Sequence, residues 1–141
     1  VIPTIITQIA NGMEKIKLGD VSPTRDFNYV GDTCRGFISI MESDQTIGET
    51  INIGSNFEIS VDDTLNIIKE LMNSDVEFVT DKQRVRPSKS EVFRLWCDNT
   101  KIEKLTEFKP QVDIREGLQR TINWIMQPNN LKHYKSEIYN V

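Results

Sequence analysis

Cysteine and long apolar runs are scarce in this sequence. Its 141 residues include only two cysteines, Cys34 and Cys97, which excludes a disulfide scaffold and a thiolate metal site. We expect both to be reduced thiols in half-buried positions. No stretch approaches the roughly 18 apolar residues of a membrane-spanning helix, and no signal-peptide pattern opens the chain. We therefore expect a soluble, cytoplasmic protein without a membrane partner.

The usual sequence signatures of catalysis are also missing. The one histidine, His133, lies in a polar C-terminal stretch, where a solvated surface side chain is expected. The sequence has no G-x-S-x-G nucleophile elbow, no glycine-rich phosphate loop, and no His and Cys cluster at metal-ligand spacing. The residues alone thus indicate neither a catalytic apparatus nor a metal site.

Neither sign of charge dominates the composition. With 17 basic and 21 acidic residues, the formal net charge of -4 excludes a protein that coats nucleic acid by bulk charge. The length and the 38% of hydrophobic residues suit about one globular domain with a buried core. Residues 1–6 are apolar from the start, without an initiator Met, so we expect the sequence to be a piece of a longer protein.

Hydrophobic periodicity and capping residues predict helices separated by short strands, which is typical of an α/β or α+β domain. Helices are expected from Pro3 to before Gly12, from Asp32 to about Met41, over 65–72 after a Ser60/Asp63 cap, from Asp98 and Asn99 to about Leu105, and from Ile114 to Met126 or Gln127 after an Asp113/Glu116 capping box. Extended pieces are expected at 16–18, 27–30, 50–54, 57–59, 76–79 and 92–96, a basic loop at 81–90, and a frayed polar tail at 128–141.

Three arginines stand where a cation needs an anion nearby. Arg25 lies between a proline turn and an apolar stretch, and Arg84 and Arg86 flank Val85. A guanidinium group can form bidentate hydrogen bonds to phosphate, which lysine cannot reproduce. The alternative is that these arginines form surface salt bridges. Their partners would then be Asp20, Asp26, Asp81 or Glu91.

A series of short blocks in order carries a resemblance to a known family. The blocks are Ile2-Pro3, Lys17-Leu18-Gly19-Asp20, residues 25–32 (RDFNYVGD), residues 51–54 (INIG), Arg86-Pro87, residues 98–101 (DNTK), residues 108–110 (FKP), residues 116–118 (EGL) and residues 121–124 (TINW). Together they resemble the C-terminal part of an extended short-chain dehydrogenase/reductase, among the NAD-dependent nucleotide-sugar epimerases and 4,6-dehydratases. The sequence of residues 86–92, followed by Leu95, Trp96 and Asp98, is most similar to that of the N-acetylglucosamine nucleotide 4,6-dehydratases of legionaminic acid biosynthesis.

The resemblance implies a fold, a domain layout and a function. The fold would be α/β, mainly helices with short strands, lacking the N-terminal Rossmann core. Residues 1–127 would form the substrate-binding C-terminal portion, and 128–141 the tail. The function would be nucleotide-sugar binding, with UDP- or GDP-N-acetylglucosamine, in a 4,6-dehydratase, a lyase of polysaccharide biosynthesis. Alternatives are a fragment of a 4-epimerase, or a non-catalytic domain that binds nucleotide sugars or a protein partner.

The same resemblance implies roles for particular residues. Backbone groups of one strand would read the base edge, two arginines would hold the diphosphate, and an asparagine and an acidic residue would lie near the nucleotide and its ribose. These residues are, in that order, Ile16, Lys17 and Leu18, then Arg25 and Arg86, then Asn52, then Glu91. No catalytic residue is implied within this sequence.

The resemblance also implies what the sequence does not contain. The dinucleotide-binding glycine fingerprint and the Y-x-x-x-K pair of the family are absent. NAD would belong to the full-length protein, and we expect the chain itself neither to bind NAD stably nor to turn over substrate. A missing Rossmann domain would leave Phe37, Ile38, Ile40 and Met41 exposed, which predicts self-association, segment exchange or rearrangement.

Overall fold

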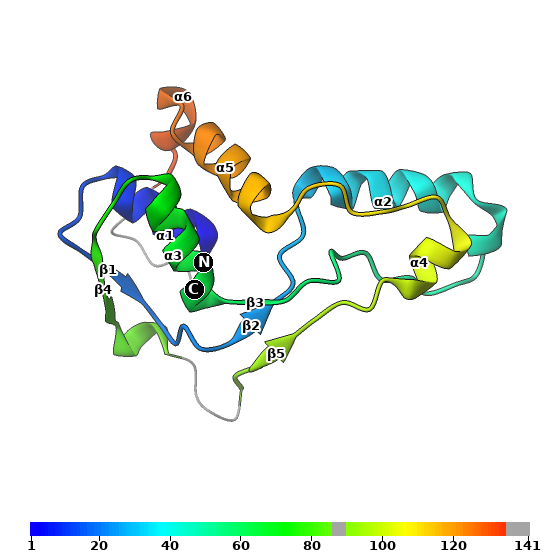
Figure 1. The fold of residues 1–141 in the computed structure, drawn as a ribbon, viewed down its shortest axis with the longest axis horizontal. Coiled ribbons are helices and arrows are strands. Elements are labelled where there is room, and N and C mark those ends of the chain that lie inside the picture. The colour runs from blue at the N-terminus through cyan, green and yellow to red at the C-terminus, as the bar shows by residue number, and fades with distance from the viewer. Residues whose placement is uncertain (86–89, 135–141) are drawn as a thin grey trace. The chain divides into compact units, whose positions relative to one another are not determined.

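The chain folds into two compact units. Figure 1 shows the computed structural model, which describes residues 1–85 and 90–134. Unit 1 contains residues 1–23, 60–93 and the segment that begins at Leu118, and unit 2 contains residues 24–59 and 94–117. The domain expected from the length is therefore organised as two parts, and the expected boundary at residue 127 stays a prediction.

Unit 1 packs helices around a parallel pair of strands. Its elements are α1 (Ile2–Ala10), β1 (Lys15–Leu18), α3 (Val61–Leu71), β4 (Glu77–Thr80), the 3-10 helix η2 (Lys82–Arg84), the larger part of α5 (Ile114–Ile125) and α6 (Pro128–Leu131). The apolar periodicity of the sequence supplies its core, because the buried side chains are mostly aliphatic. They are Ile5, Ile6, Ile16, Leu18, Val61, Leu65, Ile68, Leu118, Ile122 and Ile125.

Local sequence signals explain where the helices of unit 1 begin. Pro3 stands in the first turn of α1, where its missing N–H leaves no hydrogen bond unmade. The Ser60 hydroxyl accepts a 2.9 Å hydrogen bond from the Asp63 amide at the start of α3, which confirms the expected cap. The Asp113 carboxylate likewise accepts from the Glu116 amide at 2.8 Å at the start of α5.

The strand β1 is hydrogen-bonded on both sides. It pairs in parallel with β4, with Lys15 opposite Glu77 and Leu18 opposite Thr80. On its other side, the buried Gln8 side chain accepts from the Lys17 amide at 2.8 Å and donates to the Lys17 carbonyl at 3.2 Å. The Gln8 amide thus replaces a strand partner at this position.

Unit 2 is built around α2 and a small parallel pairing. It contains β2 (Thr24–Arg25), α2 (Val30–Glu42), the 3-10 helix η1 (Asp44–Thr46), β5 (Arg94–Leu95) and α4 (Thr100–Leu105). β2 pairs with β5 and also neighbours β3 (Ile59–Ser60). The boundary between the two units falls between Ile59 and Ser60. Figure 1 shows α2 alongside the segment that connects α4 to α5.

Polar residues make up much of the interior of unit 2. Its fully or nearly buried apolar side chains are Ile102, Phe108 and Val112, whereas Asp32, Thr46 and Asn99 are buried polar residues. Buried polar groups are costly unless each is hydrogen-bonded. The stability of unit 2 therefore depends on a few hydrogen-bond centres more than on apolar area.

The predicted class, α/β with mainly helices and short strands, is confirmed, but the strand predicted at 50–54 is wrong. This segment pairs with no strand; instead the Ile53 side chain packs against Gly36 of α2, and the Thr50 carbonyl accepts a hydrogen bond from Lys101 of α4. The stretch expected to be extended at 27–30 forms no strand either, although Tyr29 has extended dihedral angles, and α2 begins at Val30. Residues 128–131 of the predicted tail form α6, residues 135–141 lie outside the described residues, and the fraying of the tail stays a prediction.

Three of the four α2 side chains expected to be exposed are exposed in the structure. Phe37 is 59%, Ile38 53% and Met41 84% exposed. Ile40, expected in the same set, is half-buried. The outer face of this helix is therefore apolar and is not covered by the described residues of this chain.

Candidate functional site

The predicted base-reading strand lies in unit 1. Ile16 and Leu18 point into the core, whereas the Lys17 side chain is exposed. The Lys17 amide and carbonyl already bond to Gln8, and the Leu18 carbonyl accepts from the Asp81 amide at 2.7 Å. A base would have to share these groups, and their role in base reading stays a prediction.

The other predicted residues are distributed over both units. Glu91 is half-buried in unit 1, and Arg86 lies outside the described residues. Arg25 and Asn52 belong to unit 2, where Asn52 is exposed and Arg25 is half-buried. The Arg25 guanidinium donates from Nη1 to the Thr24 carbonyl at 2.7 Å. The convergence of Arg25 and Arg86 on one diphosphate stays a prediction.

The salt-bridge alternative for the arginines holds for Arg84. Its Nε lies 3.2 Å from the Asp81 carboxylate, and its side chain is only 9% exposed. Arg94 forms a second pair of this kind, donating from Nε and Nη2 to Glu58 and stacking 5.2 Å from the Trp96 ring centre. The hydrogen bond from Arg94 lowers the pKa of Glu58. These two arginines are therefore held by carboxylates of the chain itself.

Asp26, next to Arg25, ties three segments of unit 2 together. Its carboxylate accepts hydrogen bonds from the Ser55 amide at 3.0 Å, the Ser55 hydroxyl at 2.6 Å and the Asn56 amide at 3.0 Å. The Cys97 amide also donates to it, at 3.4 Å. Asp26 thus fixes the loop after Asn52 and the turn after β5 against the strand that carries Arg25.

Gly54 lies at the centre of this junction because no side chain fits there. A Cβ at this position would overlap the Cβ of Cys97 and lie 2.6 Å from its Sγ and 3.0 Å from an Asp26 oxygen. The Gly54 carbonyl accepts from the buried Asn99 side chain at 3.4 Å. The glycine predicted to close a strand therefore permits a close backbone approach instead.

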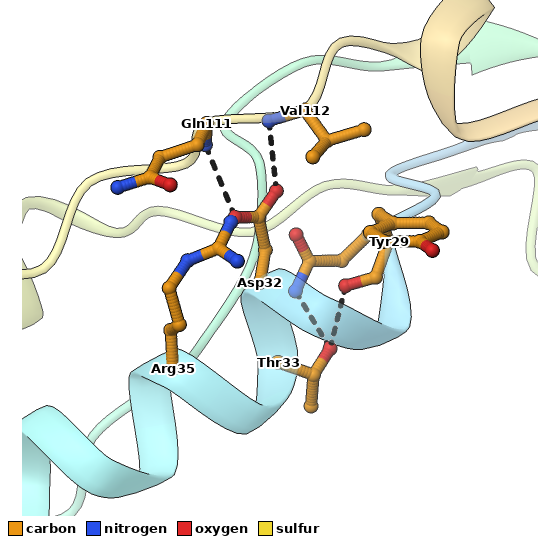
Figure 2. A network of polar contacts seen from close by, with 7 residues as sticks. Tyr29, Asp32, Thr33, Arg35, Gln111 and Val112 are labelled. Carbon is orange, nitrogen blue, oxygen red and sulfur yellow. Dashed lines mark hydrogen bonds and ion pairs between the residues drawn. The ribbon is translucent and has the colours of Figure 1, made fainter. Parts of the chain in front are cut away.

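A second carboxylate centre holds the N-terminal turn of α2, as Figure 2 shows. Asp32 is fully buried and accepts from the Gln111 amide at 3.1 Å and the Val112 amide at 3.0 Å. Its carboxylate also pairs with Arg35 one turn later. Asp32 was predicted only as the start of a helix.

A cavity of about 370 Å3 opens within unit 2 beside the Asp26 junction. Its walls come from the loop after β2, the 55–57 loop and the approach to α5, including Phe27, Ser55, Phe57, Gln111 and Asp113. Two phenyl rings and several polar groups make a lining that can accept a mixed polar and apolar ligand. Phe27 belongs to the same block as Arg25, so this cavity is the candidate pocket of unit 2.

The two cysteines have different surroundings. Cys97 is half-buried, as expected, and burial followed by the charges of Asp26 and Asp98 raises the pKa of its thiol. Cys34 is exposed, contrary to the expectation, because it lies on the outer face of α2. Both thiols are free.

We expect thiol labelling at about pH 8 to show one fast and one slow cysteine, differing by roughly tenfold or more in rate. Cys34 is the fast one because it is exposed, and Cys97 is slow because its raised pKa keeps the thiol protonated to higher pH. Stopped-flow labelling with a chromogenic disulfide measures both phases. Cys34→Ser should remove only the fast phase, and equal rates for the two thiols would contradict the assignment.

Neither a membrane helix nor a metal cluster is found in the part of the chain that the structure describes. Among residues 1–85 and 90–134, no helix is long and apolar enough to cross a membrane. The same residues contain no group of three or more His, Cys, Asp or Glu side chains placed to hold a metal ion.

Comparisons with known proteins give consistent matches. Residues 1–121 match the family model described as GDP-mannose 4,6 dehydratase. A UDP-N-acetyl-alpha-D-glucosaminuronate decarboxylase of Bacillus cytotoxicus is 33% identical over 92% of this chain and 41% of its own length. The relatives include nucleotide-sugar dehydratases, decarboxylases and epimerases.

Solved structures agree with this assignment. An epimerase from Methanothermobacter thermautotrophicus superimposes with a TM-score of 0.82 at 32% identity, over 94% of this chain and 39% of the epimerase. A UDP-glucuronic acid 4-epimerase from Bacillus cereus, in complex with UDP-glucuronic acid and NAD, gives 0.77 at 26% identity, over 88% of this chain and 38% of the epimerase.

These matches cover most of this chain but less than half of each relative. The chain spans about 40% of the length of the relatives that it matches. Within that span the fold corresponds, with a TM-score of 0.82 to the epimerase from Methanothermobacter thermautotrophicus. The chain belongs to the NAD-dependent nucleotide-sugar epimerase/dehydratase family of extended short-chain dehydrogenases/reductases.

Proposed function

We propose that this chain is the nucleotide-sugar-binding part of an NAD-dependent nucleotide-sugar 4,6-dehydratase. The substrate class is a UDP- or GDP-linked N-acetylglucosamine. The observation that carries the proposal is the match of residues 1–121 to a 4,6-dehydratase family model. The proposal includes the cytoplasm as location and polysaccharide biosynthesis as the process served.

The Arg25 block supports the binding part of this proposal. Arg25 sits on β2, and the next residue, Asp26, bonds to the loop after Asn52 and to the turn that begins at Cys97. An arginine whose neighbour is fixed by several hydrogen bonds keeps its main chain in place, so little conformational entropy is lost when its guanidinium binds an anion. We assign Arg25 and Arg86 to the diphosphate.

The remaining predicted residues complete the proposed site. Asn52 would contact the nucleotide from an exposed position in unit 2, and the Glu91 carboxylate would accept from the ribose hydroxyls. The strand that contains Ile16, Lys17 and Leu18 would face the base. Two arginines that hold the diphosphate would orient the attached sugar for reaction.

A 4-epimerase is the second candidate. It is favoured by the epimerase structures that superimpose on this chain at 26% and 32% identity. Both candidates use the same nucleotide-binding groups. Nucleotide affinity therefore cannot separate a dehydratase from an epimerase. The two are distinguished by analysing the product of a longer protein that also contains the regions of these relatives outside the matched span.

The residues of this chain do not fit a dinucleotide site. Such a site needs a glycine-rich turn between a strand and the N-terminus of a helix. β1 leads instead into Gly19, which packs against the Arg84 carbonyl, and β2 leads through Asp26 into a loop without glycine before α2. We assign no step of NAD chemistry to this chain and propose that it has no turnover alone. Formation of a 4-keto-6-deoxy sugar by the chain would contradict this.

Titration with nucleotides tests the binding site. We expect the chain to bind UDP or GDP and the matching N-acetylglucosamine conjugate. Arg25→Ala and Arg86→Ala should each weaken binding by about 10- to 100-fold, as for loss of a charged hydrogen bond. Calorimetry or NMR shift titration measures the affinities, and comparing UDP with GDP identifies the base.

A matched variant removes the same charge elsewhere. Arg115 is an exposed arginine on α5, outside the predicted site, so Arg115→Ala should leave the affinity unchanged. Equal weakening by Arg115→Ala would mean that general charge is responsible. Tight binding by both Arg25→Ala and Arg86→Ala would reject their assignment to the diphosphate.

A further inference from the structure

The groups that bond to the Asp26 carboxylate are all donors. Its Oδ1 accepts from the amide and the hydroxyl of Ser55, and its Oδ2 accepts from the amides of Asn56 and Cys97. An ionised carboxylate is acceptor-only, whereas an asparagine amide would turn its NH2 group toward one of these two pairs of donors. Only a carboxylate therefore satisfies both pairs.

Asp26 also links the two residues of unit 2 that the proposed function assigns to the nucleotide. Arg25 precedes it in the chain, and Asn52 lies three residues before Ser55 in the loop that the carboxylate binds. The Asp26 amide donates to the Leu95 carbonyl at 2.9 Å, beside the pairing of Arg25 with Leu95. Asp26 is thus held by its own amide and holds the Asn52 loop by its carboxylate.

The short segment between Asn52 and Ser55 has little freedom to move. The Ile53 side chain packs against α2, and Gly54 lies so close to Cys97 that no side chain fits between them. Since both intervening residues are in contact with a neighbouring element, the position of Asn52 depends on that of Ser55.

Granted the proposed function, we infer that Asp26 is a positioning residue of the nucleotide site. It fixes Arg25 and Asn52 relative to one another, so that both bind one ligand without further ordering. Its own carboxylate is bonded to donors of this chain, so Asp26 acts on the ligand through its neighbours. Fixing two binding groups before the ligand arrives raises affinity, because less conformational entropy is lost on binding.

The sign of the effect separates positioning from charge. A carboxylate near a phosphate site repels the anion, so removal of its charge would by itself tighten diphosphate binding. Loss of positioning weakens binding instead. Asp26→Asn removes the charge at constant size and breaks one of the two pairs of hydrogen bonds. We expect it to weaken binding of UDP or GDP by roughly tenfold or more, as measured by calorimetry on the 141-residue chain.

Asp98→Asn is the matched control for the charge. Asp98 is an exposed carboxylate that follows Cys97, and an asparagine there can still accept from the Thr100 amide. We expect its affinity for the nucleotide to be unchanged or slightly higher. A double variant separates positioning from a general effect on folding, because Asp26→Asn should cost less affinity in an Arg25→Ala background than in the unaltered chain.

Hydrogen exchange provides a readout that needs no variant. If loss of the Asp26 hydrogen bonds weakens nucleotide binding, then bound nucleotide must suppress their opening by the same factor. The amides of Ser55 and Asn56 should therefore exchange about tenfold more slowly in the chain saturated with nucleotide. The Thr46 amide, which bonds to the Ser43 carbonyl elsewhere in unit 2, should change much less.

Several outcomes would overturn the inference while leaving the proposed function in place. They are unchanged or tighter binding by Asp26→Asn, equal costs in the two backgrounds, and exchange at Ser55 and Asn56 that nucleotide does not slow or slows no more than at Thr46. If the unaltered chain binds neither UDP nor GDP, the proposed function is rejected, and the positioning role of Asp26 with it.

Discussion

Replacing Asp32 by alanine will lower the free energy of unfolding of unit 2 by about 3 kcal/mol, the order expected when buried hydrogen-bond donors lose their acceptor. The change leaves Arg35 without its carboxylate, and it leaves the amides of Gln111 and Val112 without an acceptor. Urea denaturation followed by circular dichroism measures the loss. Hydrogen exchange at the two amides should accelerate in parallel.

Two further variants separate the charge from the shape of Asp32. Asp32→Asn keeps the size of the side chain and one acceptor oxygen, so a smaller loss is expected. Asp44→Ala removes an exposed carboxylate of the same unit and should change stability by no more than about 0.5 kcal/mol. If Asp32→Ala behaved like Asp44→Ala, the Asp32 centre would not stabilise unit 2.

Substituting Gly54 by alanine is expected to destabilise the chain by about 3 kcal/mol, at the upper end for overpacking. The new methyl group would overlap Cys97 and approach the Asp26 carboxylate to 3.0 Å. Both neighbours are held by the hydrogen bonds of the junction, so neither can move without breaking them. Thermal unfolding gives the effect directly.

A double variant tests the steric origin of the Gly54 effect. Cys97→Gly removes the overlapping atoms, so Gly54→Ala should cost less in that background than in the unaltered chain. Gly117→Ala is the matched glycine control, because an added Cβ there would meet only ordinary contacts, the nearest at 3.6 Å. Strictly additive effects of Gly54→Ala and Cys97→Gly would contradict the proposed clash.

The helices were predictable because their signals are local. Pro3, the Ser60 cap and the Asp113 cap lie within one turn of the helices that they start, and α1, α3 and α5 follow. The segment 50–54 has the alternation of a strand, but a strand also needs a partner, and the structure gives it none. Pairing is a property of the fold, which alternation in one segment does not determine.

The candidate site was predictable only in part, for a related reason. The Arg25 block could be recognised from consecutive residues, but the partners of Asp26 and Asp32 could not. Asp32 bonds to main-chain amides 79 and 80 positions away, and Asp26 to an amide 71 positions away. An amide belongs to every residue except proline, so no residue type identifies these partners in the sequence.

The Gln8 side chain that completes β1 also affects the behaviour of the chain at high concentration. A strand with a free edge is a template for pairing with other molecules, which leads to aggregation and fibrils. At Lys17 both main-chain groups on that edge are already bonded to Gln8. An incoming strand cannot continue the ladder past this point, so one glutamine protects a two-stranded sheet from intermolecular growth on the β1 side.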